Sequence, residues 1–176
     1  MAPDRPPPPS RFGRGGRTSR AGIVLFGALA AACAGPPPPA PLQPVAFSHK
    51  LHAGDNQIPC EYCHSGARRS AVAGVPSLER CLGCHRIIAY DRPEIVKLAA
   101  RVEKNRPVAW IKVNDVPDFV RFNHRPHVRA RVQCQECHGP VETMERVRRF
   151  SSLEMGWCLD CHRSRGASTD CLACHH

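Results

Sequence analysis

The chain has 176 residues, with 18 prolines, 11 cysteines, and 25 Lys and Arg against 15 Asp and Glu, which gives a formal net charge of +10. Part of this charge is local, because residues 33–176 hold 20 basic and 14 acidic residues, a net charge of +6. The sequence contains no Gly-rich nucleotide-binding loop, which excludes a nucleotide-dependent enzyme of the usual kind. The high cysteine content is therefore the main guide to function.

Residues 1–33 are predicted to be an export signal. Residues 11–20 carry four arginines and no acidic residue. The apolar residues 21–32 are too short to span a bilayer, but they have the length of the hydrophobic region of a signal peptide. The rest of the chain is therefore expected on the periplasmic side of a bacterial cytoplasmic membrane.

Cys33 directly follows three alanines and resembles the lipidated cysteine of a bacterial lipoprotein, although Ala30 stands where such signals usually have leucine. We expect Cys33 to be lipidated, with ordinary cleavage near residues 32–34 or an uncleaved membrane anchor as the alternatives. Residues 34–45 contain six prolines, which favour an extended, semi-rigid tether. Residues 46–176 would then form the functional domain, held at the membrane surface.

Residues 47–85 form the first of two similar units. In this unit "FSHKLH" (47–52) is followed by "CEYCH" (60–64) and "CLGCH" (81–85). A CxxCH motif is typical of covalent haem c attachment. Two cysteines three apart on a short turn can reach the two vinyl groups on one porphyrin edge, while the following histidine swings beneath the iron. Bacteria attach haem to this motif outside the cytoplasmic membrane, in agreement with the export signal.

The same frame recurs as "CQECH" (134–138), "CLDCH" (158–162) and "CLACH" (171–175), so that five motifs use ten of the eleven cysteines. Zinc is the main alternative, since CxxC pairs also form zinc sites. A zinc site normally combines two such pairs, whereas here the number is odd and histidine follows every pair. A thioredoxin-like CxxC would occur only once. We therefore expect five covalently bound haem c groups.

The predicted covalent attachment residues are Cys60, Cys63, Cys81, Cys84, Cys134, Cys137, Cys158, Cys161, Cys171 and Cys174. The predicted proximal iron ligands are His64, His85, His138, His162 and His175.

Little regular structure is expected, because five haems would share the 144 residues from Cys33 onward at roughly 29 residues each, too few for a conventional core. The haems themselves would form the core. Residues 94–104 carry a helical stripe of apolar residues, and residues 141–150 are a second helix candidate that opens just after Pro140. Residues 106–122 are expected to be extended or loop.

Residues 122–162 repeat the first unit, with "FNHRPH" (122–127) again followed by two CxxCH motifs. In each unit the two histidines outside the motifs match the two haems in number, and neutral imidazole is a common iron ligand. The alternative, that all are surface histidines, is weakened by their repeated frame. The predicted distal ligands are His49, His52, His124 and His127, and their assignment to individual haems is left open.

The fifth haem lacks an obvious distal ligand. His176 follows His175 directly, and adjacent residues cannot hold opposite faces of one iron unless the backbone crosses the porphyrin edge. Met144, on the candidate helix, is the first choice, followed by Met155, which lies three residues before Cys158. An open site or one filled by His176 remains the alternative.

Five haems carry ten propionate carboxylates, and the simplest role of the basic excess is to offset them. Candidates are Arg68, Arg69, Arg86 and Arg163, which lie after the motifs. No nucleic-acid partner is therefore expected.

The frame FxHxxH followed by two CxxCH motifs resembles the class III multihaem cytochromes c of the c3/c7 type. That resemblance implies a haem-cored fold that is mostly irregular, with a few short α-helices and little β structure. The stretches "FSHKLHAGDNQIPCEYCH", "DRPEI", "DFVRFNHRPHV", "CQECHGPVETMERV" and "MGWCLDCHR" are similar to the pentahaem cytochrome subunit of Alternative Complex III, over about residues 45–176.

The second resemblance implies an electron-transfer subunit of a bacterial quinol-oxidising membrane complex, not an enzyme by itself. Its partners would be iron–sulfur or molybdopterin-like subunits, quinol-binding membrane subunits, and a monohaem cytochrome c or terminal oxidase as acceptor. Many members are expected to begin with a membrane helix, whereas this chain has the lipoprotein-like segment that ends at Cys33.

Two other functions remain open. One is a free periplasmic electron shuttle, against which Cys33 and the Pro-rich segment argue. The other is a multihaem enzyme that converts nitrite or hydroxylamine, which needs one iron open to substrate. Pentahaem nitrite reductases are much longer and commonly replace one motif histidine with lysine, whereas all five motifs here end in histidine. No catalytic residue is predicted.

Overall fold

The structure is a computed structural model that describes residues 39–176. The predicted signal, Cys33 and the first part of the predicted tether lie outside the described residues. No helix within residues 39–176 is long and apolar enough to cross a membrane.

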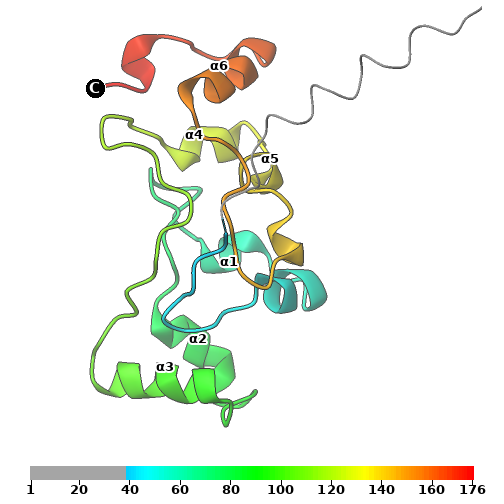
Figure 1. The fold of residues 1–176 in the computed structure, drawn as a ribbon, viewed down its shortest axis with the longest axis vertical. Helices are drawn as coiled ribbons and strands as arrows, with labels where there is room; N and C mark the ends of the chain where they lie inside the picture. The colour runs from blue at the N-terminus through cyan, green and yellow to red at the C-terminus, as the bar shows by residue number, and fades with distance from the viewer. Residues whose placement is uncertain (1–38) are drawn as a thin grey trace, which may run out of the picture. The chain divides into compact units, whose positions relative to one another are not determined.

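Short helical turns separated by irregular segments make up the described chain, and no strand occurs within residues 39–176 (Figure 1). The elements in chain order are the π-helical turn η2 (Lys50–Asp55), α1 (Cys60–Cys63), α2 (Leu78–His85), α3 (Pro93–Glu103), α4 (His124–Arg129), α5 (Cys134–His138), the 3-10 turn η3 (Val141–Thr143), α6 (Met155–Ser164) and the 3-10 turn η4 (Cys171–Ala173). The expectation of sparse, helical structure is confirmed.

The helix predicted at residues 94–104 is α3. It begins with Pro93, whose missing N–H costs nothing at the first helical position. Its stripe faces Leu78 of α2, and Leu98 is buried there. Residues 106–122 contain neither helix nor strand, which confirms the expectation of extended or loop structure.

The prediction of a helix at residues 141–150 is wrong, because only η3 (Val141–Thr143) is helical there. The carbonyl of Met144, which would bond within a continuing helix, instead accepts a hydrogen bond of 2.9 Å from the backbone N–H of Lys50. The chain therefore leaves the helical path so that Met144 packs against η2, where its side chain is buried.

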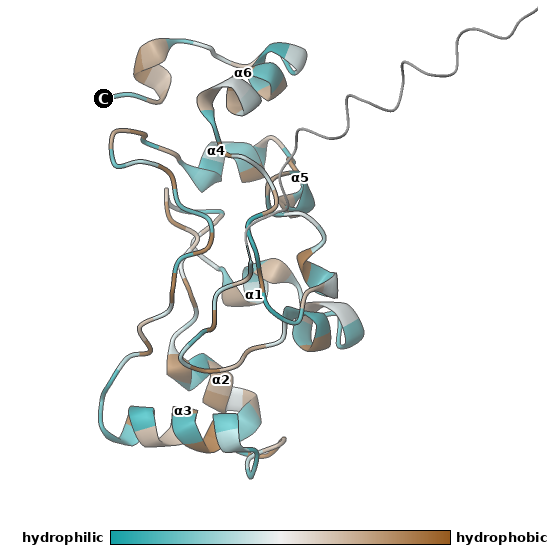
Figure 2. Ribbon diagram, in the orientation of Figure 1, coloured by the Kyte–Doolittle hydropathy of each residue, from teal (hydrophilic) through white to brown (hydrophobic). Residues whose placement is uncertain are grey.

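The side-chain core is small. Val45, Leu98 and Val108 form its centre, with partly buried residues such as Trp110 packed around them. Many large apolar residues stay exposed, among them Ile87 and Leu172. Figure 2 shows hydrophobic segments in every part of the described ribbon. Such a chain needs further apolar material to complete its interior, as a haem-cored fold would.

The end of the predicted tether already belongs to this core. The Gln43 side chain exchanges two hydrogen bonds of 2.9 Å with the backbone of Ile111, and Val45 is only 2% exposed. Any tether therefore ends before Gln43 rather than at residue 45.

Candidate haem-binding sites

All five CxxCH motifs lie on helical turns, and we number the corresponding sites 1 to 5 in chain order. α1 and α5 begin at the first cysteine of sites 1 and 3, α2 ends at the histidine of site 2, α6 contains site 4, and η4 begins site 5. None of the ten motif cysteines forms a disulfide within the described residues. A helical turn brings residues three apart to the same side, so each pair of thiols can face one porphyrin edge.

In the first unit, each histidine of "FSHKLH" faces a motif histidine. The ring centroids of His49 and His64 are 6.4 Å apart, and the two ring planes are nearly parallel, with an angle of 3° between them. The rings of His52 and His85 are 6.0 Å apart at 66°. The sequence left this assignment open, and the fold brings His49 to site 1 and His52 to site 2.

The second unit repeats this arrangement. His124 faces His138 of site 3 at 6.3 Å and 4°, and His127 faces His162 of site 4 at 6.0 Å and 47°. The first pair of each unit is thus nearly parallel and the second is inclined, which means that the units agree in orientation as well as in sequence.

These separations fit an iron ion between the two rings. A metal ion binds an imidazole nitrogen at about 2 Å, and that nitrogen lies roughly 1 Å from the ring centroid, so two ligands on opposite sides have centroids roughly 6 Å apart. Rings packed directly on each other would be closer. The donor set therefore suits a haem with two axial histidines.

Hydrogen bonds to the backbone fix which ring nitrogen is free. In seven histidines, Nδ1 lies 2.5–3.1 Å from a backbone carbonyl oxygen. The histidine and its acceptor residue are, in turn, His52 and Ser48, His64 and Gly74, His85 and Ile88, His124 and Ala71, His127 and Asn123, His162 and Ser168, and His175 and Phe119. A carbonyl can only accept, so Nδ1 donates and Nε2 keeps its lone pair for a metal. No sequence pattern identifies these scattered carbonyls.

His49 differs, because its Nδ1 is buried without a hydrogen-bond partner. Burial, reinforced by the nearby His64 and His52, lowers the pKa of His49 to about 4. Burial also lowers the pKa of His138, with smaller contributions from His124 and His64. Both rings are therefore neutral near pH 7, as an iron ligand must be.

The phenylalanine of each FxHxxH segment orients both histidines. Phe47 meets His49 edge-on at 4.8 Å and stacks on His52 at 4.4 Å. Phe122 meets His124 edge-on at 4.8 Å and lies 4.8 Å from His127. The sequence included this phenylalanine in the repeated frame without giving it a role.

Site 5 has a different neighbour. The ring of His175 lies 6.0 Å from that of Phe119, at 22°, and no histidine ring of residues 39–176 faces it as the FxHxxH histidines face those of sites 1 to 4. Arg121 holds the motif by its backbone N–H, which donates to Cys174 at 2.7 Å, and by its side chain, which donates to the carbonyl of His176 at 3.1 Å.

The two candidate methionines lie in different surroundings. Met144 is 8% exposed beside η2, where it contacts the first unit through Lys50. Met155 is 66% exposed at the first position of α6.

Three arginines expected to offset propionates already pair with carboxylates. Arg68 bonds to Glu61 at 2.6 Å, Arg86 to Glu79 at 2.8 Å and Arg163 to Asp160 at 3.3 Å. These arginines therefore balance acidic side chains around the motifs.

Comparison with known proteins agrees with this chemistry. Residues 120–176 match the family of cytochrome c7 and related cytochrome c. The multihaem cytochrome c subunit of menaquinone reductase from Nitratidesulfovibrio vulgaris (Hildenborough) is 28% identical over 160 residues, which cover 76% of this chain and 76% of that protein.

Proposed function

Because this chain has the fold of a cytochrome c7-type multihaem cytochrome, an electron-transfer class, we propose that it carries five haem c groups and relays electrons for a quinone-linked membrane complex. The observation that carries the proposal is the set of four facing histidine pairs, with centroids 6.0–6.4 Å apart. Each pair joins one motif histidine to one histidine of an FxHxxH segment.

In this proposal, two histidines would hold the haem iron at each of sites 1 to 4: His64 with His49, His85 with His52, His138 with His124, and His162 with His127. Bound haem c supplies a one-electron couple between ferric and ferrous iron. Two imidazole ligands at each site would leave no open position for a substrate, so these sites would supply electron transfer alone. In six of these eight histidines, all but His49 and His138, a carbonyl bonded to Nδ1 holds the ring in the ligating tautomer.

At site 5 we favour Met155 over Met144 as the distal ligand. Met144 is already buried against the first unit, whereas Met155 is exposed on the helix that carries site 4. Burial raises the pKa of Cys158 on that helix, and the nearby Cys174 of site 5 raises it further. A thioether ligand would raise the potential of this haem above that of the others.

The partner complex is proposed from two likenesses. The relative from N. vulgaris is named as a subunit of menaquinone reductase, and the sequence resembles the pentahaem subunit of Alternative Complex III, which oxidises quinol. Both favour a quinone-binding membrane partner, and the resemblance to Alternative Complex III adds iron–sulfur or molybdopterin-like subunits as neighbours. We place the periplasmic end of the relay at a monohaem cytochrome c or terminal oxidase, with electrons leaving the quinol.

The test is isolation of the protein from bacterial membranes in mild detergent. We expect an intact mass with five haem additions, co-purification with quinone-binding and iron–sulfur subunits, and haem reduction on addition of a menaquinol analogue. Fewer than five haems, or bound zinc, would overturn the cofactor assignment. Recovery as a free, soluble protein would instead support a periplasmic shuttle.

Membrane attachment is tested separately. Labelling with a fatty-acid analogue should mark the wild type and not Cys33→Ser, whereas equal labelling would contradict lipidation. Site 5 is the one position where an open iron would favour an enzyme, since none of the four FxHxxH histidines pairs with His175. Nitrite and hydroxylamine should leave the spectrum of the reduced protein unchanged, and a new ligand-bound spectrum would favour the enzyme.

A further inference from the structure

The order of the sites along the relay can be derived from contacts between the motifs, and this inference rests on the proposed function. Within the first unit, the helices of sites 1 and 2 touch, because the guanidinium of Arg80 on α2 lies 5.1 Å from the ring centroid of Tyr62 on α1. Their distal ligands, His49 and His52, stand three residues apart on one turn. Sites 1 and 2 are therefore neighbours.

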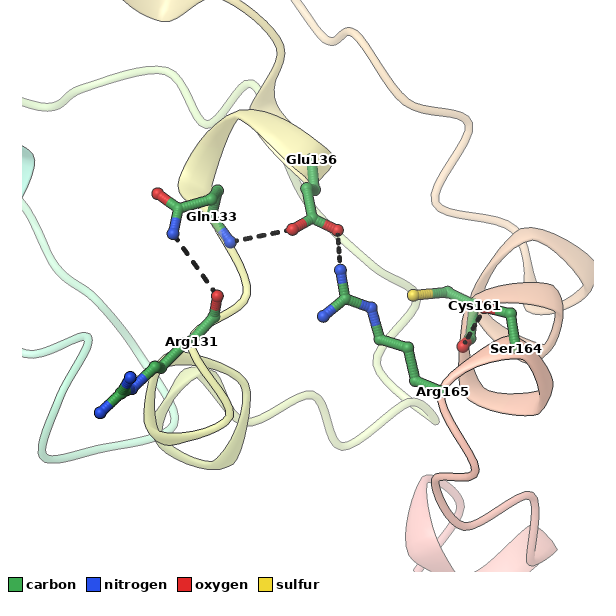
Figure 3. A network of polar contacts seen from close by, with 6 residues as sticks. All are labelled: Arg131, Gln133, Glu136, Cys161, Ser164 and Arg165. Carbon is green, nitrogen blue, oxygen red and sulfur yellow. Dashed lines mark hydrogen bonds and ion pairs between the residues drawn. The ribbon is translucent and has the colours of Figure 1, made fainter.

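Within the second unit, sites 3 and 4 are joined by an ion pair. Arg165, just after α6, donates to the carboxylate of Glu136 on α5 at 2.6 Å. Figure 3 shows this contact and, on the same carboxylate, the backbone N–H of Gln133 at 3.1 Å. His124 and His127 again share one turn, α4.

The two units meet through sites 1 and 3. The carbonyl of Ala71, in the loop after site 1, accepts from both Nδ1 and the backbone N–H of His124, at 2.7 and 3.2 Å. The same loop supplies the carbonyl of Gly74 to Nδ1 of His64, at 2.6 Å. One loop therefore bonds to the proximal ligand of site 1 and to the distal ligand of site 3.

The thiols agree with this junction. Burial raises the pKa of the Cys134 thiol, and the neighbouring Cys60 thiol, which shares a hydrogen bond with it, raises it further. The first cysteines of sites 1 and 3 thus face each other.

Site 5 extends the second unit. Its motif is held by the backbone of Phe119 and by Arg121, directly before the ligand segment of sites 3 and 4. Nδ1 of His162 at site 4 donates to the carbonyl of Ser168 at 2.5 Å, and the hydroxyl of Ser168 accepts from the backbone N–H of Asp170, directly before the motif of site 5, at 3.3 Å. Site 4 is therefore the neighbour of site 5.

We infer that the five sites form one unbranched series in the order 2–1–3–4–5, and that the loop of residues 65–74 positions the junction between sites 1 and 3. The order differs from that of the sequence, because the second unit joins the first at site 1. Sites 2 and 5 are the two ends of the series, where electrons enter and leave.

The order is tested by an iron anomalous-scattering map of crystals of the haem-loaded protein. We expect the iron of site 1 to have sites 2 and 3 as its nearest neighbours, and the iron of site 5 to have site 4. Five irons in any other order would overturn the inference while leaving the cofactor load intact. Fewer than five irons in a fully matured sample would instead contradict the proposed function.

The role of the loop is tested with Gly66→Ala. A Cβ at Gly66 would lie 2.5 Å from the carbonyl oxygen of Val72 and 2.7 Å from that of Ala73, both in backbone. The loop must therefore shift, and we expect the EPR g-values of two haems, at sites 1 and 3, to change together. A change at one haem alone, or at none, would contradict a shared loop.

The matched control is Gly83→Ala, which gives site 2 the motif sequence of site 5. A Cβ there meets nothing within 4 Å, so the spectra of sites 1 and 3 should stay unchanged. If Gly66→Ala prevents haem maturation, the anomalous map of the wild type still decides the order.

Discussion

The two units of this protein, residues 47–85 and 122–162, place their histidines alike but stabilise them differently. The pairs His49 with His64 and His124 with His138 agree within 0.1 Å and 1° (6.4 Å and 3° against 6.3 Å and 4°). However, Nδ1 of His124 is bonded to a carbonyl of the first unit, whereas Nδ1 of His49 is buried without a partner. The facing geometry of the histidine pairs is thus the same in both units, and contacts between the units make the surroundings of the pairs unequal.

The turns that carry the FxHxxH histidines also differ in their surroundings between the two units. η2 of the first unit packs against η3 of the second, and Gly54 lies so close that a Cβ would be 2.3 Å from the carbonyl oxygen of Glu142. Arg129, the corresponding residue 75 positions later, is exposed. The first unit therefore contacts the second in two places, through the carbonyl of Ala71 and through η2, although the two sequences are duplicates.

The largest expected effect comes from removing a distal ligand. His49→Ala and His124→Ala should each keep all covalent haem but convert one haem of five from low spin to high spin, because one axial position is lost. EPR and visible spectra measure this change, with the exposed His176→Ala as the control. Unchanged spectra in both variants would exclude these residues as ligands.

A smaller effect is expected at the contact between the units. Gly54→Ala forces η2 away from η3 and should lower the free energy of unfolding by about 1–3 kcal/mol, the usual range for an overpacked contact. Chemical denaturation of the haem-loaded protein measures it. Arg129→Ala, at the equivalent exposed position, should change stability by less than about 0.5 kcal/mol. Equal effects of the two substitutions would mean that the units are not held together through η2.

The residue before each first histidine provides a third comparison. Ser48 Oγ accepts from the backbone N–H of Leu51 at 3.0 Å, and the Asn123 side chain accepts from that of Arg125, also at 3.0 Å. Ser48→Ala and Asn123→Ala each remove such a bond and should cost about 0.5–2 kcal/mol. Ser48→Asn should restore most of the loss in the first unit. A failure of this exchange would show that the two turns are not equivalent.

The sequence was sufficient to predict the parts that depend on local spacing. A few neighbouring residues are enough to recognise a CxxCH motif, an FxHxxH segment or the amphipathic helix α3, because helical geometry brings residues three or four apart to the same side. The expectation of sparse, helical structure followed from the number of motifs and the shortness of the chain, whereas the c3/c7-type fold class followed from the resemblance of the FxHxxH and CxxCH frame. The same local reasoning failed at residues 141–150, because the backbone N–H of Lys50, far away in sequence, donates a hydrogen bond to the carbonyl of Met144.

Long-range contacts were not predictable from this single sequence. The assignment of His49 to site 1, the carbonyls of Ala71 and Gly74, and the position of Phe119 beside His175 all depend on segments that meet only in the folded chain. Backbone carbonyls are also present at every residue, so no residue type marks the ones that bind a histidine.

The smallest expected effect concerns the contacts that join the two motif helices of each unit. In the first unit, Arg80 lies over the ring of Tyr62, and in the second, Arg165 pairs with Glu136. Arg165→Ala should cost only about 0.2–1 kcal/mol, because the side chains of this ion pair are 45% and 38% exposed and solvent screens it. Arg80→Ala should cost about 0.5–1 kcal/mol.

Raising the salt concentration distinguishes the two substitutions. Screening should abolish the effect of Arg165→Ala, whereas the packing of Arg80 on the Tyr62 ring should preserve most of the effect of Arg80→Ala. Denaturation at low and high salt measures both, and an equal salt dependence would show that the two units join their helices by the same kind of contact.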